Sequence, residues 1–162
     1  MLFRSNFFLG NEPTKGWGPF RRLDHATANR IALEQIREMG IRRINDAGQL
    51  VGTMSGGERQ ALAIARALYF GARLLILDEP TAALGVKESK IVIDLMIKAR
   101  AQGIALVFIT HNATHALQVG DRFTVLIQGR IASQFKRGEK TREEVLNLMA
   151  GGEEFDATGH GD

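Results

Sequence analysis

The chain has 162 residues, 44% of them hydrophobic, which is enough for one ordinary domain with a core of its own. It contains no cysteine, so disulfides, thiolate metal sites and a cysteine nucleophile are excluded. The formal net charge is +3, but the cations are interleaved with acids, and we therefore expect a solvated surface with no nucleic-acid partner.

Apolar runs are short along the whole sequence. The first ten residues contain one cation and a broken apolar run, which is a poor secretory signal. The longest apolar run in the body of the chain, residues 104–109, falls far short of the roughly 18 residues that span a bilayer. We therefore expect a cytoplasmic chain whose contact with a membrane is peripheral.

Two helices are predicted in the first half of the chain. Residues 1–24 mix glycine, proline and aromatic residues, which predicts an irregular connection. Apolar positions then recur at helical spacing over residues 25–39. Ser55 begins a second helix, because Glu58 follows three residues later and completes a capping-box pattern. We place the end of this helix at Gly71.

A strand, a helix and a second strand follow. Residues 74–77 form a continuous apolar run closed by Asp78, a pattern typical of a strand buried on both faces of a parallel sheet. Helical spacing over residues 86–102 leads to a second apolar run over residues 104–109. Strand–helix–strand order predicts a right-handed parallel crossover.

The remaining residues predict a short helix, a hairpin and a last helix. The short helix lies near residues 113–117, and the hairpin joins residues 123–127 to residues 130–133. Thr141, with Glu144 three residues later, caps a helix that extends through residue 150. The glycine-rich acidic tail after it has too little apolar content to pack.

Four short segments carry the residues suited to chemistry. Asp78 and Glu79 close the first apolar strand, and carboxylates at the C-terminal end of a parallel strand are well placed for catalysis. Ser55 lies at a helix N-terminus, where free backbone N–H groups and the positive end of the dipole suit a phosphate. His111 follows the next strand, so we expect it beside Glu79 at the same sheet edge. In chain order the segments are MSGGE at 54–58, LLILDEP at 74–80, TAALG at 81–85 and ITH at 109–111.

Taken together, the four segments resemble the ABC ATPase family over at least residues 51–150. They correspond to its signature sequence, its Walker B strand with the adjacent glutamate, its D-loop and its switch histidine. The resemblance implies an α/β fold, in which part of a P-loop NTPase (RecA-like) core with a parallel sheet joins the α-helical subdomain of ABC proteins. It places the connection and helical subdomain at 1–72, the C-terminal half of the ATPase core at 73–150 and a disordered tail at 151–162.

The resemblance also implies ATP and Mg²⁺ as cofactors. Asp78 would hold Mg²⁺ through its water shell, and Glu79 would orient and polarise the attacking water. His111 would lie near the terminal phosphate. The residues expected to contact ATP are Ser55, Gly56, Gly57 and Glu58 of the signature, which closes over ATP on the opposite subunit of a dimer, and Ala83 and Gly85 of the D-loop.

Each of these residues also has an ordinary structural interpretation. Ser55 and Glu58 form a helix cap, and capping boxes are common. Asp78 and Glu79 form an acidic strand end, and His111 is a loop histidine with its hydrogen bonds satisfied. The order of the four segments favours the functional interpretation over these alternatives.

The D-loop departs from the usual family pattern. Gly85 stands where the family usually has an aspartate, and a glycine makes no polar contact across a dimer. The TAALG form at 81–85 and the NFFLG run at 6–10 are similar to ATP-binding proteins of carbohydrate importers, which favours simple-sugar uptake. The departure either slows hydrolysis or alters the coupling of the two ATP sites.

The sequence contains no G-x-x-x-x-G-K-[ST] loop, the Walker A element that cradles phosphates in P-loop ATPases. Residues 10–16 have their glycine and lysine in the wrong order for it. The family's glutamine-containing loop and adenine-stacking aromatic are also missing. Charge-assisted hydrogen bonds contribute about 1.5–3 kcal/mol each. We therefore expect that the chain alone neither binds ATP tightly nor hydrolyses it.

The sequence therefore predicts an ATP-binding, ATP-hydrolysing subunit of an ABC transporter that energises sugar import, present as an N-terminally truncated chain. Its partners would be a second ATP-binding subunit and membrane permease subunits, at the cytoplasmic face of the membrane. The alternative is a non-catalytic module that completes a nucleotide site on an intact ATPase partner. Chromosome-maintenance ATPases share two of the motifs, but their long flanking heptads are not seen.

Overall fold

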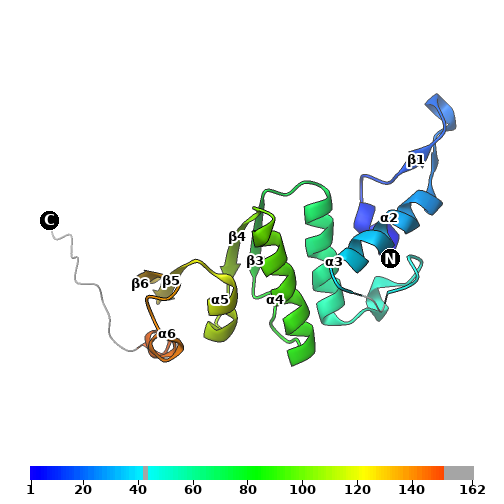
Figure 1. Cartoon of the computed structure of the whole chain (residues 1–162). Helices are drawn as coiled ribbons and strands as arrows, with labels where there is room; N and C mark the ends of the chain where they lie inside the picture. The colour runs from blue at the N-terminus through cyan, green and yellow to red at the C-terminus, as the bar shows by residue number, and fades with distance from the viewer. Residues whose placement is uncertain (42–43, 152–162) are drawn as a thin grey trace. The chain divides into compact units, whose positions relative to one another are not determined.

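A computed structural model of the chain describes residues 1–41 and 44–151, and Figure 1 shows its elements. These residues form two compact units. The first consists of Met1–Leu75 and Pro80–Leu106, and the second of Ile76–Glu79 with the described residues from Val107 onward. The disordered tail expected at 151–162 lies, apart from its first residue, outside the described residues.

Helices dominate the first unit. They are α1 (Phe3–Phe8), α2 (His25–Glu38), α3 (Gly56–Tyr69) and α4 (Val86–Ala101), with short 3-10 helices η1 (Gly18–Phe20) and η2 (Val51–Thr53). A small antiparallel hairpin, β1 (Thr14–Lys15) with β2 (Arg22–Leu23), precedes α2. The core is formed by apolar side chains of α1, α2, α3 and α4, among them Phe3, Phe7, Ile36, Leu62 and Leu95.

Residues 3–8 correct the prediction of an irregular N-terminus. Phe3, Phe7 and Phe8 are buried on one side of α1, with exposed fractions of 0%, 0% and 2%. Burying an aromatic side chain contributes about 1.5–3 kcal/mol, and three of them stabilise a helix that is too short to be stable in isolation. The prediction was wrong because the polar residues between the aromatics obscured this packing.

Local capping sets the ends of the longer helices, as the sequence predicts for Ser55, Glu58 and Gly71 but not for Asp24. Asp24 accepts a hydrogen bond from the Thr27 N–H at 3.1 Å at the start of α2. Ser55 and Glu58 form the expected capping box at the start of α3. Gly71 follows the end of α3 with φ +81°, a left-handed conformation that glycine adopts at little cost.

Two neighbouring strands, β3 (Leu74–Asp78) and β4 (Ala105–Ile109), are hydrogen-bonded to each other. The Ala105 N–H donates to the Arg73 C=O, and the Glu79 N–H donates to the Ile109 C=O, both at 3.0 Å. The starts of the two strands therefore lie together, and so do their ends, as in the expected parallel pair. Both carboxyl ends meet at one edge.

The expectation that β3 is buried on both faces is wrong for the described residues. Leu75 and Leu77 are 7% and 9% exposed, but Ile76 between them is 66% exposed. Alternate side chains of a strand point to opposite faces, so one face of β3 is packed and the other is open. A continuous apolar run does not by itself show that both faces are covered.

The second unit continues with α5 (Ala113–Val119), β5 (Arg122–Ile127), β6 (Arg130–Lys136) and α6 (Arg142–Met149). Strands β5 and β6 form the predicted antiparallel hairpin. Gln128 and Gly129, both with positive φ, make its two-residue turn. The small core of this unit includes Val125, Phe135, Val145 and Leu148. Among the helices that the structure describes, none is long and apolar enough to cross a bilayer.

Candidate functional site

Glu79 follows the last residue of β3 in a strained backbone conformation. Its φ is +44°, in the left-handed region that non-glycine residues seldom adopt. The hydrogen bond from its N–H to the Ile109 C=O ties this turn to the end of β4. Strain of this kind persists only where the surrounding structure fixes it, and it is frequent at functional sites.

Three groups from the segment after β4 hold the Glu79 carboxylate. Oε1 accepts the His111 backbone N–H at 2.8 Å and lies 2.7 Å from His111 Nδ1. Oε2 accepts the Thr110 hydroxyl at 3.3 Å. The Glu79 side chain is 33% exposed and that of His111 is 81% exposed. The expected proximity of Glu79 and His111 is confirmed, and both side chains remain open to solvent.

These contacts set the charge of Glu79. Burial raises the pKa of the Glu79 carboxyl, but the hydrogen bonds from the His111 side chain and backbone, its charge and the Thr110 hydroxyl together outweigh burial. The net result is a pKa below the ordinary value of 4.5. At neutral pH Glu79 is therefore an ionised acceptor, which suits it to orient a water molecule by its remaining lone pairs.

Asp78 is exposed at the end of β3, directly before Glu79. In residues 1–41 and 44–151 no group of three or more His, Cys, Asp or Glu side chains is placed to hold a metal ion. Mg²⁺ keeps several waters and is bound by one or two carboxylates together with substrate phosphates. Asp78 therefore fits a Mg²⁺ that arrives with a nucleotide, and it does not make a metal site on its own.

The N-terminus of α3 contains the first candidate phosphate-contacting residues. Ser55 Oγ accepts the Glu58 N–H at 3.3 Å, and Glu58 Oε2 accepts the Ser55 N–H at 2.8 Å. Glu58 is 8% exposed, so its carboxylate is engaged in capping. The N–H groups of Gly56 and Gly57, the first two residues of the helix, have no acceptor within it. Gly57 is buried, so the N–H of the half-buried Gly56 is the more accessible donor for a ligand.

The two glycines also permit a close contact inside the chain. A Cβ at Gly56 would lie 2.6 Å from Leu84 Cδ2, and a Cβ at Gly57 would lie 2.9 Å from Glu88 Cβ. The N-terminus of α3 therefore packs against the segment that begins α4, and Figure 1 shows the two helices side by side. Sequence reasoning missed Leu84 and Glu88, because residues about thirty positions apart give no local signal.

The D-loop residues lie at this same contact. Ala83 has φ +57°, a second left-handed residue close behind Glu79. Gly85 is the N-cap of α4, where its N–H donates to Glu88 Oε2 at 3.2 Å. The first unit thus brings Ser55–Glu58 together with Ala83–Gly85, and the second unit brings Glu79 together with Thr110 and His111. Sequence reasoning did not single out Thr110, whose hydroxyl directly before His111 was the available signal.

Comparison with known proteins gives consistent results. Residues 4–82 match the family model of the ABC transporter. The chain is 40% identical over 154 residues to the fructose import ATP-binding protein FrcA of Rhizobium meliloti, covering 92% of this chain and 58% of FrcA. It is 42% identical over 107 residues to the xylose/arabinose import ATP-binding protein XylG of Sulfolobus acidocaldarius, covering 66% and 43%.

A third relative is the ribose import ATP-binding protein RbsA of Chromobacterium violaceum, 35% identical over 148 residues, with 91% of this chain and 28% of the relative covered. The chain thus spans about half of FrcA and less of the other two. The expected family is confirmed. The expected similarity to ATP-binding proteins of sugar importers is confirmed as well.

Solved structures agree on the fold. The ADP conformation of MJ1267, an ATP-binding cassette of an ABC transporter, superposes with a TM-score of 0.66 at 21% identity, covering 93% of this chain and 59% of that one. A dimeric post-hydrolysis state of the ATP-binding cassette MJ0796, bound to ADP and Pi, gives a TM-score of 0.58 at 28% identity, covering 71% and 49%. The predicted α/β fold, a partial P-loop NTPase core, is confirmed. The chain belongs to the family of ATP-binding domains of ABC transporters.

Proposed function

We propose that this chain acts in an ATP-hydrolysing subunit that energises the import of a sugar. The observation that carries the proposal is the position of the ionised Glu79 against His111 at the carboxyl ends of β3 and β4. Three relatives are ATP-binding proteins for fructose, xylose/arabinose and ribose import, which supports a sugar as cargo. Proteins of this family bind ATP with Mg²⁺.

In this proposal Glu79 orients the attacking water. Phosphoryl transfer needs positioning and charge stabilisation more than covalent help, and an ionised carboxylate held by three hydrogen bonds is a fixed acceptor for that water. Asp78 contributes a carboxylate toward the water shell of Mg²⁺. Because His111 Nδ1 faces Glu79, the Nε2 atom of this exposed ring donates to the terminal phosphate when the imidazole is protonated.

Residues Ser55–Glu58 act on the ATP bound to a second ATP-binding subunit. The N–H groups of Gly56 and Gly57, which have no acceptor within the helix, would supply donors, and the helix dipole of α3 favours a phosphate in front of them. Ala83 and Gly85 lie beside the N-terminus of α3, because Leu84 between them packs against Gly56. The dimeric state of MJ0796 supports the idea of a paired arrangement.

The proposal also assigns a separate role to each part of the chain. Residues 1–72 form the helical part that contacts membrane permease subunits, and residues 73–150 form half of the ATPase core. The subunit works at the cytoplasmic face of the membrane, as a peripheral component. The printed sequence contains no G-x-x-x-x-G-K-[ST] loop, so the proposal concerns the ATPase subunit to which these residues belong.

A second candidate function rests on the contact between the signature and the D-loop. The capping box at Ser55 and Glu58 and the packing of Gly56 against Leu84 favour a non-catalytic module that completes a nucleotide site on an intact ATPase partner. In this candidate function Glu79 and His111 play no part in hydrolysis.

The experiment that separates the two functions uses FrcA of Rhizobium meliloti as the intact relative. A chimaera in which the N-terminal part of FrcA, together with a G-x-x-x-x-G-K-[ST] segment, precedes this chain is expressed in cells that lack FrcA. Restored fructose uptake, lost again with Glu79→Gln, is the result expected for the hydrolysing subunit. An inactive chimaera, combined with stimulation of a signature-disabled FrcA by the unmodified chain, would instead support the non-catalytic module.

A further inference from the structure

The hairpin formed by β1 and β2 exposes two aromatic side chains near its tip. Trp17 is 87% exposed, Phe20 is 76% exposed, and Leu23 at the end of the hairpin is 52% exposed. Every residue from Thr14 to Leu23 is exposed, and the hairpin extends away from the helices of the first unit (Figure 1). Single apolar residues on a surface are ordinary, but two aromatics together on a projecting tip are not.

The tip is built to present these aromatics. Gly16 has φ +97°, and a Cβ there would lie 2.5 Å from the Phe20 carbonyl oxygen, so only glycine fits. Pro19 fixes the backbone inside η1, and the Phe20 N–H donates to the Trp17 C=O at 3.2 Å. These constraints lower the conformational entropy that the tip would lose on binding.

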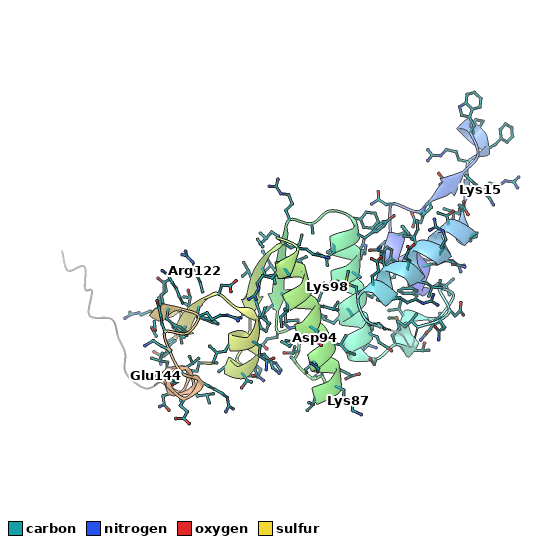
Figure 2. All side chains as sticks on the ribbon, in the orientation of Figure 1. Lys15, Lys87, Asp94, Lys98, Arg122 and Glu144 are labelled. Carbon is teal, nitrogen blue, oxygen red and sulfur yellow. The ribbon has the colours of Figure 1, made fainter. Side chains whose placement is uncertain are left out.

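Three cations lie on the same hairpin as the aromatics. Lys15, Arg21 and Arg22 are all exposed, and Figure 2 shows Lys15 on the hairpin. The Arg21 guanidinium donates to the Thr14 hydroxyl at 2.7 and 3.2 Å, a neutral partner that leaves its charge in place. None of the ion pairs found among the described residues includes any of the three.

Asp24, which directly follows the hairpin in the chain, caps the next helix. Asp24 accepts the Thr27 N–H at 3.1 Å and the Thr27 hydroxyl at 2.9 Å as the cap of α2. These two hydrogen bonds, followed by the charge of Lys15, lower the pKa of Asp24. Asp24 therefore stays ionised at the base of the hairpin, and the hairpin itself, residues 14–23, is basic because it contains three cations and no acidic residue.

We propose that this hairpin binds the surface of an anionic lipid bilayer, with Trp17 and Phe20 at the level of the headgroups. Tryptophan is enriched at membrane interfaces because its ring is apolar and its N–H remains hydrogen-bonded. Basic residues beside it are attracted to anionic headgroups and extend their apolar stems along the interface. This contact goes beyond the proposed function, since it requires neither ATP nor a permease.

Charge and shape favour a lipid surface over a protein partner. A stable protein interface buries about 800 Å² on each side around a well-packed centre. Beside its two aromatics the tip consists of Gly16, Gly18 and Pro19, residues with small or no side chains, so it presents little area for such an interface. Exposed aromatics with cations on the same hairpin can insert into a soft anionic interface without a matching pocket.

Trp17 is the only tryptophan in the chain, so its fluorescence reports on this hairpin alone. The full chain is mixed with vesicles of phosphatidylglycerol and phosphatidylcholine, or of phosphatidylcholine alone. With the anionic vesicles we expect a blue shift of Trp17 emission, quenching by brominated lipid and co-sedimentation that high salt weakens. No shift and no co-sedimentation with anionic vesicles would overturn the proposal, while the proposed ATPase function would stand.

Variants assign the binding to the hairpin. Phe20→Ala keeps the fluorophore and is expected to weaken vesicle binding about fivefold or more, since it removes a large apolar side chain. Lys15→Gln, Arg21→Gln and Arg22→Gln are each expected to cost about fivefold. The matched controls, Val86→Ala and Lys87→Gln, remove an equally exposed apolar side chain and a cation from α4 and should bind like the parent.

Two results with these variants would count against the proposal. Binding that Phe20→Ala and the three charge variants leave unchanged would place the lipid contact elsewhere on the chain. A Trp17 response to polyglutamate with none to vesicles would identify an acidic protein surface as the partner and overturn the bilayer assignment.

Discussion

Glu79 and His111 are joined twice, through the His111 backbone N–H at 2.8 Å and through Nδ1 at 2.7 Å, both to the same carboxylate oxygen. Because the ionised carboxylate only accepts hydrogen bonds, Nδ1 of His111 carries the hydrogen in this contact. Nε2 is then directed away from Glu79, on a ring that is 81% exposed. The pair thus combines a fixed acceptor with an accessible imidazole nitrogen.

Replacing either member of this pair tests its role in hydrolysis. The test uses the chimaera with an added G-x-x-x-x-G-K-[ST] segment. Glu79→Gln is expected to lower its Mg-ATP hydrolysis rate about 10²- to 10⁴-fold, the effect typical of losing a positioned general base. His111→Ala is expected to lower the rate as well. ATP affinity should change little, because neither residue is placed to hold most of the nucleotide. His115→Ala, a histidine of α5 with no assigned role, is the control and should retain the rate.

The depressed pKa of Glu79 predicts a specific pH response. Since the folded pKa lies below the unfolded value near 4.5, the contact stabilises the protein fully above that value, and this stability is lost as the pH falls through the folded pKa. The carboxyl ¹³C resonance of Glu79, followed by NMR, should titrate below 4.5. In His111→Ala its midpoint should move upward; an unchanged midpoint would show that His111 does not hold the carboxylate.

Gly57 is predicted to be a packing requirement in addition to a phosphate contact. A Cβ there would meet Glu88 Cβ at 2.9 Å and Glu88 Cα at 3.2 Å, so Gly57→Ala should cost about 1–3 kcal/mol of unfolding free energy. Gly56→Ala should cost less, because it meets only the flexible end of Leu84. Gly52→Ala, with nothing within 4 Å, is the control. Urea unfolding that ranks Gly57→Ala with Gly52→Ala would contradict this packing.

Gly85→Asp tests the departure in the D-loop. A Cβ at Gly85 would meet only Glu88 Oε2, at 3.8 Å, and the N-cap position suits aspartate. The substitution should therefore change stability by only a few tenths of a kcal/mol. A changed hydrolysis rate in the chimaera would then report the carboxylate itself, whereas an unchanged rate would show that glycine is fully compatible with turnover.

Local signals predicted most of the fold. The helix starts at Ser55 and Thr141 follow from capping boxes whose partners are three residues away, and the structure has both. The proximity of Glu79 and His111 followed from parallel strands whose carboxyl ends share an edge. These inferences succeeded because the determining interactions lie within one turn or one sheet edge.

Packing between residues far apart in the chain could not be predicted from the sequence. Helix α1 forms because Phe3 and Phe7 are buried by helices distant in sequence, and no local pattern shows that burial. The open face of β3 was missed because an apolar run looks the same whether one or both of its faces are covered. The contact of Gly57 with Glu88 joins residues 31 positions apart, where spacing carries no information.

The most direct test of the account compares Mg-ATP hydrolysis by the purified chain with that of the chimaera that carries the G-x-x-x-x-G-K-[ST] segment. The account predicts hydrolysis by the chimaera, abolished by Glu79→Gln, and none above background by the chain alone. Hydrolysis by the unmodified chain, or a chimaera that binds ATP and turns it over equally well with Glu79→Gln, would contradict it.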